Sequence, residues 1–570
     1  MPGLVIAFRL CYNHAMAADH ALTAADLSAQ QRDISVSEFF LKNRHLLGFD
    51  SGAKALVTTV KEAVDNALDA CEEAGILPEI RVEVSASRHE DDVFVVSVED
   101  NGPGIVEEQL SRIFGKLLYG SRFHKLAQSR GQQGMGIAAA GMYAELTTGK
   151  PLHVLSRVKG EPKATEMHVS IDTARNRPVL HKKRHVKWDR PHGTRVEAEL
   201  QGHYQKGPHS VEMYLKQTAM ANPHVTLHLR GPDGESSAYK RVNRVLPPRP
   251  VAVKPHPHGV ELGLLIQMLR QTRCRNLLQF LESEFARVGR KTAQEIIQRA
   301  HTHVSSRSYP RRIAHAEANA LYRAMQRVPV SAPTTDCIVP IGEAQLLAGL
   351  RNEVAADFHA VVTRPAAVYR GNPFQVEIAI AYGRPDTGNA PKAAVNGSAK
   401  GEGKRSRPGG DATALVSAAD EPIRLLRFAN RVPLLYEPGA CAITKAVIQT
   451  NWRHYGLKQS KGSLPLGPLL VMAHIASVWV PFTSEAKEAI AAYPEIVKEL
   501  TLGLQECGRR LAAHVRRQAQ RRQEIERRAY VERYLPYIGE ALQDILGLSD
   551  KDRDGAVHRL DDTLRRTREH

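Results

Sequence analysis

Three short segments between residues 61 and 136 constrain this chain more than any other feature of its sequence. They are the acidic segment Lys61–Asp69, the strand end Asp100–Gly104 and the glycine loop Gly131–Gly136, each beside a predicted helix or strand. Glycines let the backbone approach a ligand closely, and the amides at a helix N-terminus favour an anion. The order of these segments predicts an α/β layer with a pocket, and phosphate is the natural ligand of the glycine loop.

The first segment belongs to a predicted helix over residues 54–73. Its spacing of i, i+4 and i+7 places Glu62, Asn66 and Asp69 on one face. Valines and a leucine line the other face, which is therefore expected to pack (Val57, Val60, Val64 and Leu68). A carboxylate can deprotonate an attacking water, and an amide oxygen one turn away can coordinate Mg²⁺. Taken alone, such a face is most often a solvated helix surface.

The other two segments also have a plain alternative when each is considered by itself. The strand predicted over residues 93–99 ends in Asp100-Asn101-Gly102, and Asn-Gly favours a tight hairpin turn. A glycine loop before a helix, here predicted over residues 137–146, can be a mobile connector.

Length and charge restrict the class of protein. A chain of 570 residues is too long for one core and predicts about three or four domains. The 78 Lys and Arg against 61 Asp and Glu leave a net charge of +17, which favours a polyanionic partner such as nucleic acid. A basic protein without such a partner is the alternative.

Targeting signals and metal motifs are not evident in the sequence. The longest apolar stretches fall short of the roughly 20 residues that cross a bilayer, so no membrane partner is expected. No signal peptide is expected either, and Met16 could be the true start. Six scattered cysteines without a CxxC or a Cys/His cluster argue against a zinc site and against a disulfide framework. A reducing cytoplasm fits this pattern best.

Composition divides the remainder of the chain. A proline-dense stretch over residues 246–258 predicts an inter-domain connection, and residues 259–326 have a helical pattern. Strands are predicted over residues 375–382 and 423–428 with a helix over 443–449, which indicates a second α/β domain. Residues 384–420, almost without large apolar side chains, predict a disordered loop. One long helix is predicted over residues 502–534, followed by a short amphipathic segment over residues 537–548.

The order of motifs resembles the ATP-binding domain of the GHKL family, which gyrase, Hsp90, histidine kinases and MutL share. The order consists of Glu62-x-x-x-Asn66, then D-x-G-x-G at 100–104, then G-x-x-G-x-G at 131–136, then Gly193-Thr194 before a strand. Neither the dinucleotide fingerprint nor a Walker A sequence fits, because the loop lacks a Lys-Ser/Thr ending and the acidic helix comes first.

Within GHKL proteins the resemblance narrows to the B subunits of DNA topoisomerase VI, the type IIB enzymes, from about residue 34 onward. The segments that carry it include KPHPHGVELG (254–263), RGNPFQVEIAIAYG (370–383), LRFANRVPLLYEPGAC (426–441) and VWVPFTSEAKEAI (478–490). The resemblance implies an α+β multidomain fold. Its parts are an N-terminal extension (1–30), a GHKL (Bergerat) α/β sandwich (31–230), a helix-two-turns-helix domain (245–328), an α/β transducer domain (329–500) and a C-terminal helical region (501–570).

The resemblance also implies roles for individual residues in binding ATP and Mg²⁺. Glu62 would be the general base, Asn66 a Mg²⁺ ligand, and Asp100 the acceptor for the adenine amino group, aided by Thr194. Lys487 would reach the γ-phosphate from the transducer, although without the resemblance it would be taken for an ordinary exposed lysine. The pocket edge and the phosphate lid would be formed by glycines (Gly102, Gly104, Gly131, Gly134 and Gly136).

The partners implied are double-stranded DNA, a second B subunit that dimerises on ATP binding, and an A subunit that cleaves DNA within an A2B2 heterotetramer. The activity implied is ATP-driven passage of one duplex through another in the cytoplasm, at the nucleoid. The segment Tyr537–Leu548 is the expected docking helix for the A subunit.

The residues that could contact DNA are less clear from the sequence. The family's usual Trp-Lys-x-Tyr motif, a proposed DNA contact, is replaced here by Trp452-Arg-His-Tyr455. Basic side chains over residues 181–184 and arginine pairs in the last long helix could also contact phosphates, although such runs are more often solvated.

Three other functions compete with this interpretation. A MutL-like repair ATPase shares the first four motifs but does not explain KPHPHGVELG. A DNA-binding scaffold with a decayed nucleotide pocket would have lost Glu62 or the loop glycines, and both are present. A sensor kinase would need a phosphoacceptor helix that is not visible.

Overall fold

The computed structural model describes residues 42–566, except 88–89, 121–124, 132–133, 384–415 and 419, together with residues 28, 38 and 40. The expected N-terminal extension (1–30) and nearly all of the expected loop (384–420) therefore lie outside the described residues. The last part of that loop is described, and there Val416 and Ser417 are buried. The Ser417 hydroxyl donates a hydrogen bond to the carbonyl of Gly467 at 2.6 Å, so these two residues belong to the second α/β domain.

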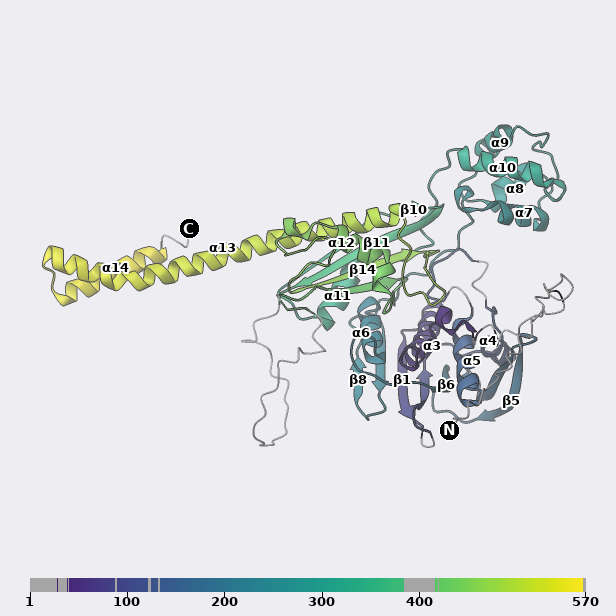
Figure 1. Cartoon of the computed structure of the whole chain (residues 1–570), viewed down its shortest axis with the longest axis horizontal. Helices are drawn as coiled ribbons and strands as arrows, with labels where there is room; N and C mark the ends of the chain where they lie inside the picture. Colours follow the sequence, from purple (N-terminus) through teal and green to yellow (C-terminus); the bar gives the residue numbers. More distant parts are fainter. Residues whose placement is uncertain are drawn as a thin grey trace, which may run out of the picture.

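The first domain is an eight-stranded sheet with helices packed on one face (Figure 1). The strand order is β5-β4-β3-β6-β2-β1-β7-β8, and the neighbours are antiparallel except for β1 and β7. The elements in chain order are α3 (Gly52–Ala74), β1 (Glu79–Ala86), β2 (Val93–Glu99), α4 (Glu107–Phe114), α5 (Gly136–Thr148), β3 (Leu152–Arg157), β4 (Ala164–Asp172), β5 (Arg177–Val186), β6 (Gly193–Gln201), α6 (Val211–Ala221), β7 (Thr226–Arg230) and β8 (Ser236–Tyr239).

Helix α3 is positioned by its buried face and by its two ends. The four aliphatic residues predicted to pack are all buried in the core of the first domain. The Ser51 hydroxyl accepts a hydrogen bond from the amide of Lys54 at 3.3 Å and caps the first turn. Gly75 ends the helix with φ of 73°, a conformation that glycine adopts without strain. The polar face of α3 is thereby held against the neighbouring loops.

A small helical module stands apart from the two sheets in Figure 1. It consists of α7 (Leu262–Gln271), α8 (Leu277–Glu284), α9 (Arg290–Arg299) and α10 (His315–Arg327), which share one hydrophobic core. Val288 and Gly289 lie in the connection between α8 and α9, and the helical pattern predicted over residues 259–326 is confirmed.

The second sheet has the strand order β10-β11-β14-β12-β13. A further strand, β9, pairs antiparallel with β11 outside this order. Its elements are α11 (Glu343–Glu353), β9 (Phe358–Thr363), β10 (Ala367–Tyr369), β11 (Asn372–Tyr382), β12 (Arg424–Ala429), β13 (Val432–Pro433), α12 (Ala442–Gln449) and β14 (Leu469–Ser477). Strand β14 is buried along its whole length because both faces of the sheet are covered. The α+β multidomain architecture predicted from the sequence is confirmed.

The C-terminal arm differs from the prediction in one respect. Residues 537–546 are not a separate segment, because α13 runs unbroken from Pro494 to Leu546 with Pro536 inside it. Gly547, with φ of 59°, ends α13, and α14 (Asp550–Arg566) folds back beside it. Packing on the second sheet at one end and against α14 at the other holds the helix together across the hydrogen bond lost at Pro536. Among the described helices, none combines the length and the apolar character of a membrane span.

Candidate nucleotide site

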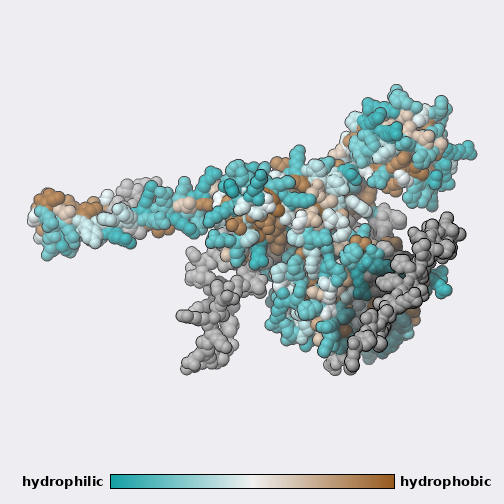
Figure 2. Space-filling model, in the orientation of Figure 1, coloured by the Kyte–Doolittle hydropathy of each residue, from teal (hydrophilic) through white to brown (hydrophobic). Residues whose placement is uncertain are grey.

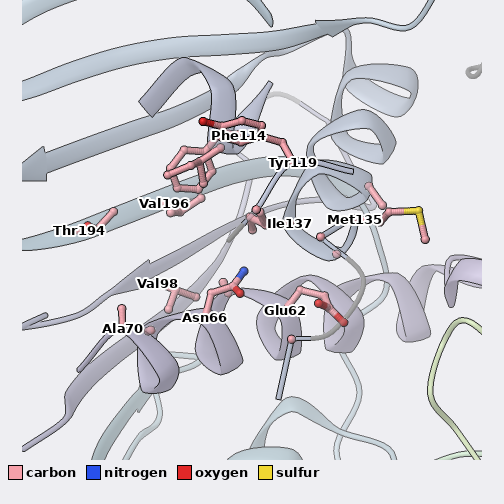
Figure 3. Close-up of a pocket in the computed structure, with 18 of the residues that line it drawn as sticks. Glu62, Asn66, Ala70, Val98, Phe114, Tyr119, Met135, Ile137, Thr194 and Val196 are labelled. Atoms are coloured by element: carbon pink, nitrogen blue, oxygen red, sulfur yellow. The ribbon is translucent and has the colours of Figure 1, made fainter. Parts of the chain in front are cut away.

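A cavity of about 530 Å³ lies between α3, the ends of β2 and β6, the glycine loop and a turn from the second domain (Figure 3). Of the ten residues predicted to form the site, only Gly102 does not line this cavity. The other nine do: Glu62, Asn66, Asp100, Gly104, Gly131, Gly134, Gly136, Thr194 and Lys487. Segments separated by up to 425 positions, from Glu62 to Lys487, therefore meet at one place.

One end of the cavity has an apolar wall and one buried carboxylate. Side chains on β2, β6, α4, α5 and the loop before α4 form the wall (Val98, Val196, Phe114, Ile137 and Ile105). The Asp100 Oδ1 accepts hydrogen bonds from the amides of Gly102 at 2.7 Å and Thr194 at 3.1 Å. Among the described residues both hydrogen bonds to this carboxylate are made to Oδ1, so Oδ2 is the oxygen available to a ligand. Burial raises the pKa of Asp100 to about 6, against the two amides that lower it.

Two glycines at this end are required by close contacts. A Cβ on Gly104 would lie 2.1 Å from the carbonyl oxygen of Arg157, and one on Gly193 would lie 2.2 Å from that of Asp100. Both also have positive φ, of 76° and 138°. The backbone around Asp100 therefore depends on residues without side chains, and the apolar wall beside it suits a planar ring.

The opposite end carries Glu62 and Asn66, one turn apart on α3. The Glu62 side chain is 16% exposed, and the Nζ of Lys61 lies 3.4 Å from its Oε1. Burial acts to raise the pKa of Glu62, but the ammonium groups of Lys61 and Lys487 bring it below its ordinary value. The carboxylate is thus ionised at neutral pH and can accept a proton from water. The Asn66 amide is exposed to the cavity.

Helix α5 begins directly against Glu62. A Cβ on Gly136, the first residue of α5, would lie 1.7 Å from the Oε2 of Glu62. Gly134 has φ of 59°, and its carbonyl accepts a hydrogen bond from the amide of Leu118 at 3.1 Å. The glycine loop therefore brings backbone amides and a helix N-terminus beside the carboxylate, an arrangement that favours phosphate.

Lys487 enters the cavity from the second domain. Its Nζ donates a hydrogen bond to the carbonyl of Arg130 at 3.1 Å, at the start of the glycine loop. Burial lowers the pKa of Lys487, although the nearby Glu62 carboxylate acts to raise it. Its backbone has φ of 56°, a conformation that costs a residue with a Cβ about 1 kcal/mol or more and that recurs at ligand sites. The lysine is therefore not the exposed surface residue that it would be taken for from its local sequence.

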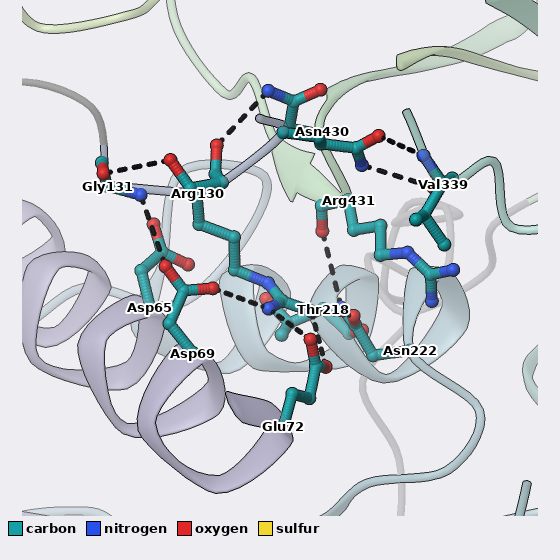
Figure 4. A network of polar contacts seen from close by, with 12 residues as sticks. Asp65, Asp69, Glu72, Arg130, Gly131, Thr218, Asn222, Val339, Asn430 and Arg431 are labelled. Atoms are coloured by element: carbon teal, nitrogen blue, oxygen red, sulfur yellow. Dashed lines mark hydrogen bonds and ion pairs between the residues drawn. The ribbon is translucent and has the colours of Figure 1, made fainter. Parts of the chain in front are cut away.

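A buried ion-pair cluster behind the glycine loop was not predicted (Figure 4). The guanidinium of Arg130 donates to Asp69 Oδ1 at 2.8 Å, to both oxygens of Glu72 at 2.7 and 2.8 Å, and to Asn222 Oδ1 at 2.6 Å. Burial acts to raise the pKa of Glu72, but Arg130 and His224 hold it well below its usual range. Asp69 thus holds Arg130 in place. The prediction that Asp69 shares the chemically active face of α3 with Glu62 and Asn66 is wrong, because its carboxylate is taken up by this ion pair.

The second domain is bonded to this cluster and to the residues before the glycine loop. The Asn222 amide donates to the carbonyl of Arg431 at 3.3 Å, and the Asn430 amide donates to that of Ser129 at 3.1 Å. Gln128 and Val339 exchange two hydrogen bonds of 3.1 and 2.6 Å. The glycine loop is therefore attached on one side to α3 and on the other to the second domain (Figure 4).

The basic segments singled out in the sequence lie away from this cavity. On β5, two of the cations over residues 181–184 are in ion pairs, Lys183 with Glu107 and Arg184 with Glu166. Arg453 donates from its exposed guanidinium to the carbonyl of Gln459 at 2.8 and 2.6 Å.

Two family models match the chain. The family of histidine kinase-, DNA gyrase B- and HSP90-like ATPases matches residues 52–200, and the topoisomerase VI B subunit transducer matches residues 333–527. The B subunit of type 2 DNA topoisomerase 6 from Archaeoglobus fulgidus is 43% identical over 535 residues, which cover 94% of this chain and 83% of that protein. The same subunit of Methanococcoides burtonii is 44% identical over 524 residues, which cover 92% and 79%.

The fold and the cavity define a GHKL-type ATPase domain joined to a transducer domain. The chain belongs to the family of type 2 DNA topoisomerase 6 B subunits. The resemblance identified from the sequence is thereby confirmed, and the MutL-like and sensor-kinase alternatives are set aside.

Proposed function

We propose that this chain is the ATP-binding and ATP-hydrolysing B subunit of a type IIB DNA topoisomerase. The observation that carries the proposal is the cavity that is complete only when Lys487 of the second domain lies beside Glu62 of the first. A site shared by two domains can convert the presence of a phosphate into a domain position. ATP binding would close two copies into a gate, and hydrolysis would reset it.

The geometry supports a distinct task for each end of the cavity. The Oδ2 of Asp100 would accept a hydrogen bond from the adenine amino group, while the backbone amide of Thr194 donates to Oδ1. Glu62 would orient and deprotonate the water that attacks the γ-phosphate, and Lys487 would contact that phosphate. Gly102 would fix the Asp100 carboxylate, while Gly104, Gly131, Gly134 and Gly136 would admit the nucleotide backbone closely.

Mg²⁺ suits the donor set beside Glu62. This ion keeps several waters and binds through one or two protein oxygens together with phosphate oxygens. The Asn66 amide oxygen, exposed to the cavity, would supply the protein ligand. When bound, the ion would neutralise charge that develops on the transferred phosphoryl group.

The C-terminal arm is the proposed docking site for an A subunit, in an A2B2 heterotetramer. Figure 2 shows hydrophobic residues at the far end of α13 and α14. The exposed apolar side chains in this region are Tyr537, Ile538, Ile545, Leu546 and Leu560. Exposed apolar side chains on a helical arm favour a protein partner. The A subunit would supply the tyrosine that cleaves DNA, and the assembly would act on double-stranded DNA in the cytoplasm, at the nucleoid.

Lys487→Ala should remove the response to the γ-phosphate while leaving DNA binding intact. The substitution removes a charge-assisted contact of about 1.5–3 kcal/mol but retains a Cβ at the strained backbone position. We expect dimerisation with a non-hydrolysable ATP analogue to weaken at least about tenfold, with loss of strand passage when the A subunit is added. Analytical ultracentrifugation and a decatenation assay measure the two effects.

The matched control for Lys487 is Lys461→Ala, which removes an exposed lysine of the same domain. The affinity for DNA should fall with salt concentration by the same slope in the native chain, in Lys487→Ala and in Lys461→Ala. That slope depends on the number of phosphates that the whole basic surface neutralises, and one lysine changes it little. Normal dimerisation and strand passage by Lys487→Ala would show that the switch lies elsewhere in the transducer.

Gly136→Ala should impair hydrolysis with little effect on folding. The added Cβ would occupy the place of the Glu62 Oε2, so the carboxylate must turn away from the cavity. We expect ATP turnover to fall at least about tenfold, an increase of roughly 1.4 kcal/mol in the barrier. Gly263→Ala, where a Cβ meets open space, is the control. Unchanged turnover in Gly136→Ala would show that the position of Glu62 does not limit hydrolysis.

A further inference from the structure

Two histidines and a glutamate form a cluster on the face of the first sheet that the helices leave uncovered. His153 lies on β3, and Glu166 and His168 lie on β4. Their neighbours Val154, Met167 and Val169 point into the core, so strand alternation sends the three polar residues to the opposite face. His153 and His168 are directly paired across the two strands, and their rings stack with centroids 4.8 Å apart.

Two of the three distances between the candidate ligand atoms are close to those of a tetrahedral metal site. Glu166 Oε1 lies 3.3 Å from the Nε2 of His153 and 3.5 Å from the Nε2 of His168. All three ligand atoms lie within 4.8 Å of one another. Zinc bonds of about 2.0–2.1 Å in a tetrahedron place neighbouring ligands about 3.3 Å apart. The buried Nε2 of His153 faces Glu166 Oε1 at 3.3 Å and makes no hydrogen bond with any residue that the structure describes, so a cation at the centre of the cluster would satisfy it.

The surrounding residues orient two of the three ligands. The Nδ1 of His153 lies 2.5 Å from Glu197 Oε2, and a carboxylate there favours a proton on Nδ1, which leaves Nε2 as the nitrogen that would bind a metal. Carboxylates that hold metal-binding histidines in this way raise metal affinity. The Nε of Arg184 donates to Glu166 Oε2 at 2.6 Å, which turns Oε1 toward the histidines. The Nη2 of Arg184 also donates a hydrogen bond to Oε1 at 2.8 Å, and a bound metal would replace this one hydrogen bond.

We propose that His153, Glu166 and His168 bind a divalent transition cation, zinc in preference to magnesium. Two imidazoles and one carboxylate are a ligand set that zinc favours, whereas magnesium requires oxygens. A fourth position would remain for water on the uncovered face. The expectation that the chain has no zinc site followed from its scattered cysteines, and this cluster contains none. The competing occupant is a second proton on His153, carried by Nε2 and directed at Glu166, while Nδ1 donates to Glu197.

The test is metal binding by the purified full chain after treatment with a chelator, and it does not depend on ATPase activity. We expect one equivalent of Zn²⁺ to compete with a chromophoric chelator. Co²⁺ should give the intense visible absorption of a tetrahedral site without the near-ultraviolet band of a thiolate ligand. His168→Ala should abolish stoichiometric binding, and Glu197→Gln should weaken it about tenfold or more by releasing His153.

His185→Ala is the control, because His185 lies on β5 and pairs with a carboxylate, Glu107, at 2.7 Å outside the cluster. It should bind the metal as the native chain does. The proposal is overturned if the native chain binds no equivalent of Zn²⁺, if His168→Ala binds it unchanged, or if His185→Ala loses it equally. A thiolate band in the Co²⁺ spectrum would also overturn it, by placing the metal on a cysteine.

Discussion

Glu62→Gln is expected to reduce ATP turnover by about 10²–10⁴-fold while nucleotide binding persists. An amide of the same size fills the same space beside Gly136 but cannot take a proton from water, and a positioned base contributes about this factor. The effect should appear in kcat and not in the affinity for ATP, because the adenine end of the cavity is formed by other residues. Glu62→Ala should bind ATP and stall in the same way.

Single-turnover ATPase assays and titration with a fluorescent nucleotide separate the two quantities. Glu73→Gln is the matched control, since it removes an exposed carboxylate near the end of the same helix. Turnover within about threefold of the native rate corresponds to only roughly 0.65 kcal/mol of barrier. A result of that size in Glu62→Gln would assign the base to another residue.

Local patterns predicted the parts of the site that one element supplies. The i, i+4 spacing of Glu62 and Asn66 places both side chains at the cavity because α3 is regular and its apolar face is buried. The glycines could likewise be predicted from the sequence. Positive φ and the close approach of other backbone atoms require glycine at these positions, whatever the rest of the fold. The same spacing argument was wrong for Asp69, because Arg130, which binds it, comes from a loop 61 residues away.

Contacts between distant segments could not be predicted from local sequence. Lys487 was assigned to the site only through a family resemblance, and its own neighbours would have indicated a surface lysine. The Arg130 cluster had a weak signal, an arginine directly before the glycine loop and two carboxylates at i and i+3 on α3. Glu166-x-His168 on a strand could have suggested ligands on one face, but only the pairing of β3 with β4 brings His153 to them.

The long helix shows the opposite kind of error. The sequence predicted a helix that ends at residue 534 and a separate short segment after it, whereas α13 continues through Pro536, which removes one backbone hydrogen bond from the helix. The structure retains one helix because its ends are fixed by packing on the second sheet and by the return of α14. Tertiary contacts here outweigh a local preference of about 3 kcal/mol.

Arg130→Met is expected to destabilise the first domain by about 3–5 kcal/mol, the largest effect on folding among these variants. The substitution leaves the Glu72 and Asp69 carboxylates buried without their cation, and the cost of uncompensated buried charge exceeds that of a lost surface pair. The urea midpoint of the first domain measures it. Arg81→Met is the control, because the Arg81 side chain is 58% exposed and its ion pairs of 3.6 and 4.0 Å should contribute less than about 1 kcal/mol.

The pH dependence distinguishes lost charge pairing from lost packing. In the native chain the pKa of Glu72 is lowered, so its ion pair stabilises the fold above the ordinary carboxylate pKa, and that contribution is lost as the pH falls through the lowered value. In Arg130→Met burial acts on Glu72 without its main counter-ion, and the carboxylate can be neutralised by a proton. The difference in stability between the two proteins should therefore shrink as the pH falls. A difference that stays constant with pH would attribute the loss to packing of the arginine stem, and the attachment of the glycine loop to α3 would then not be electrostatic.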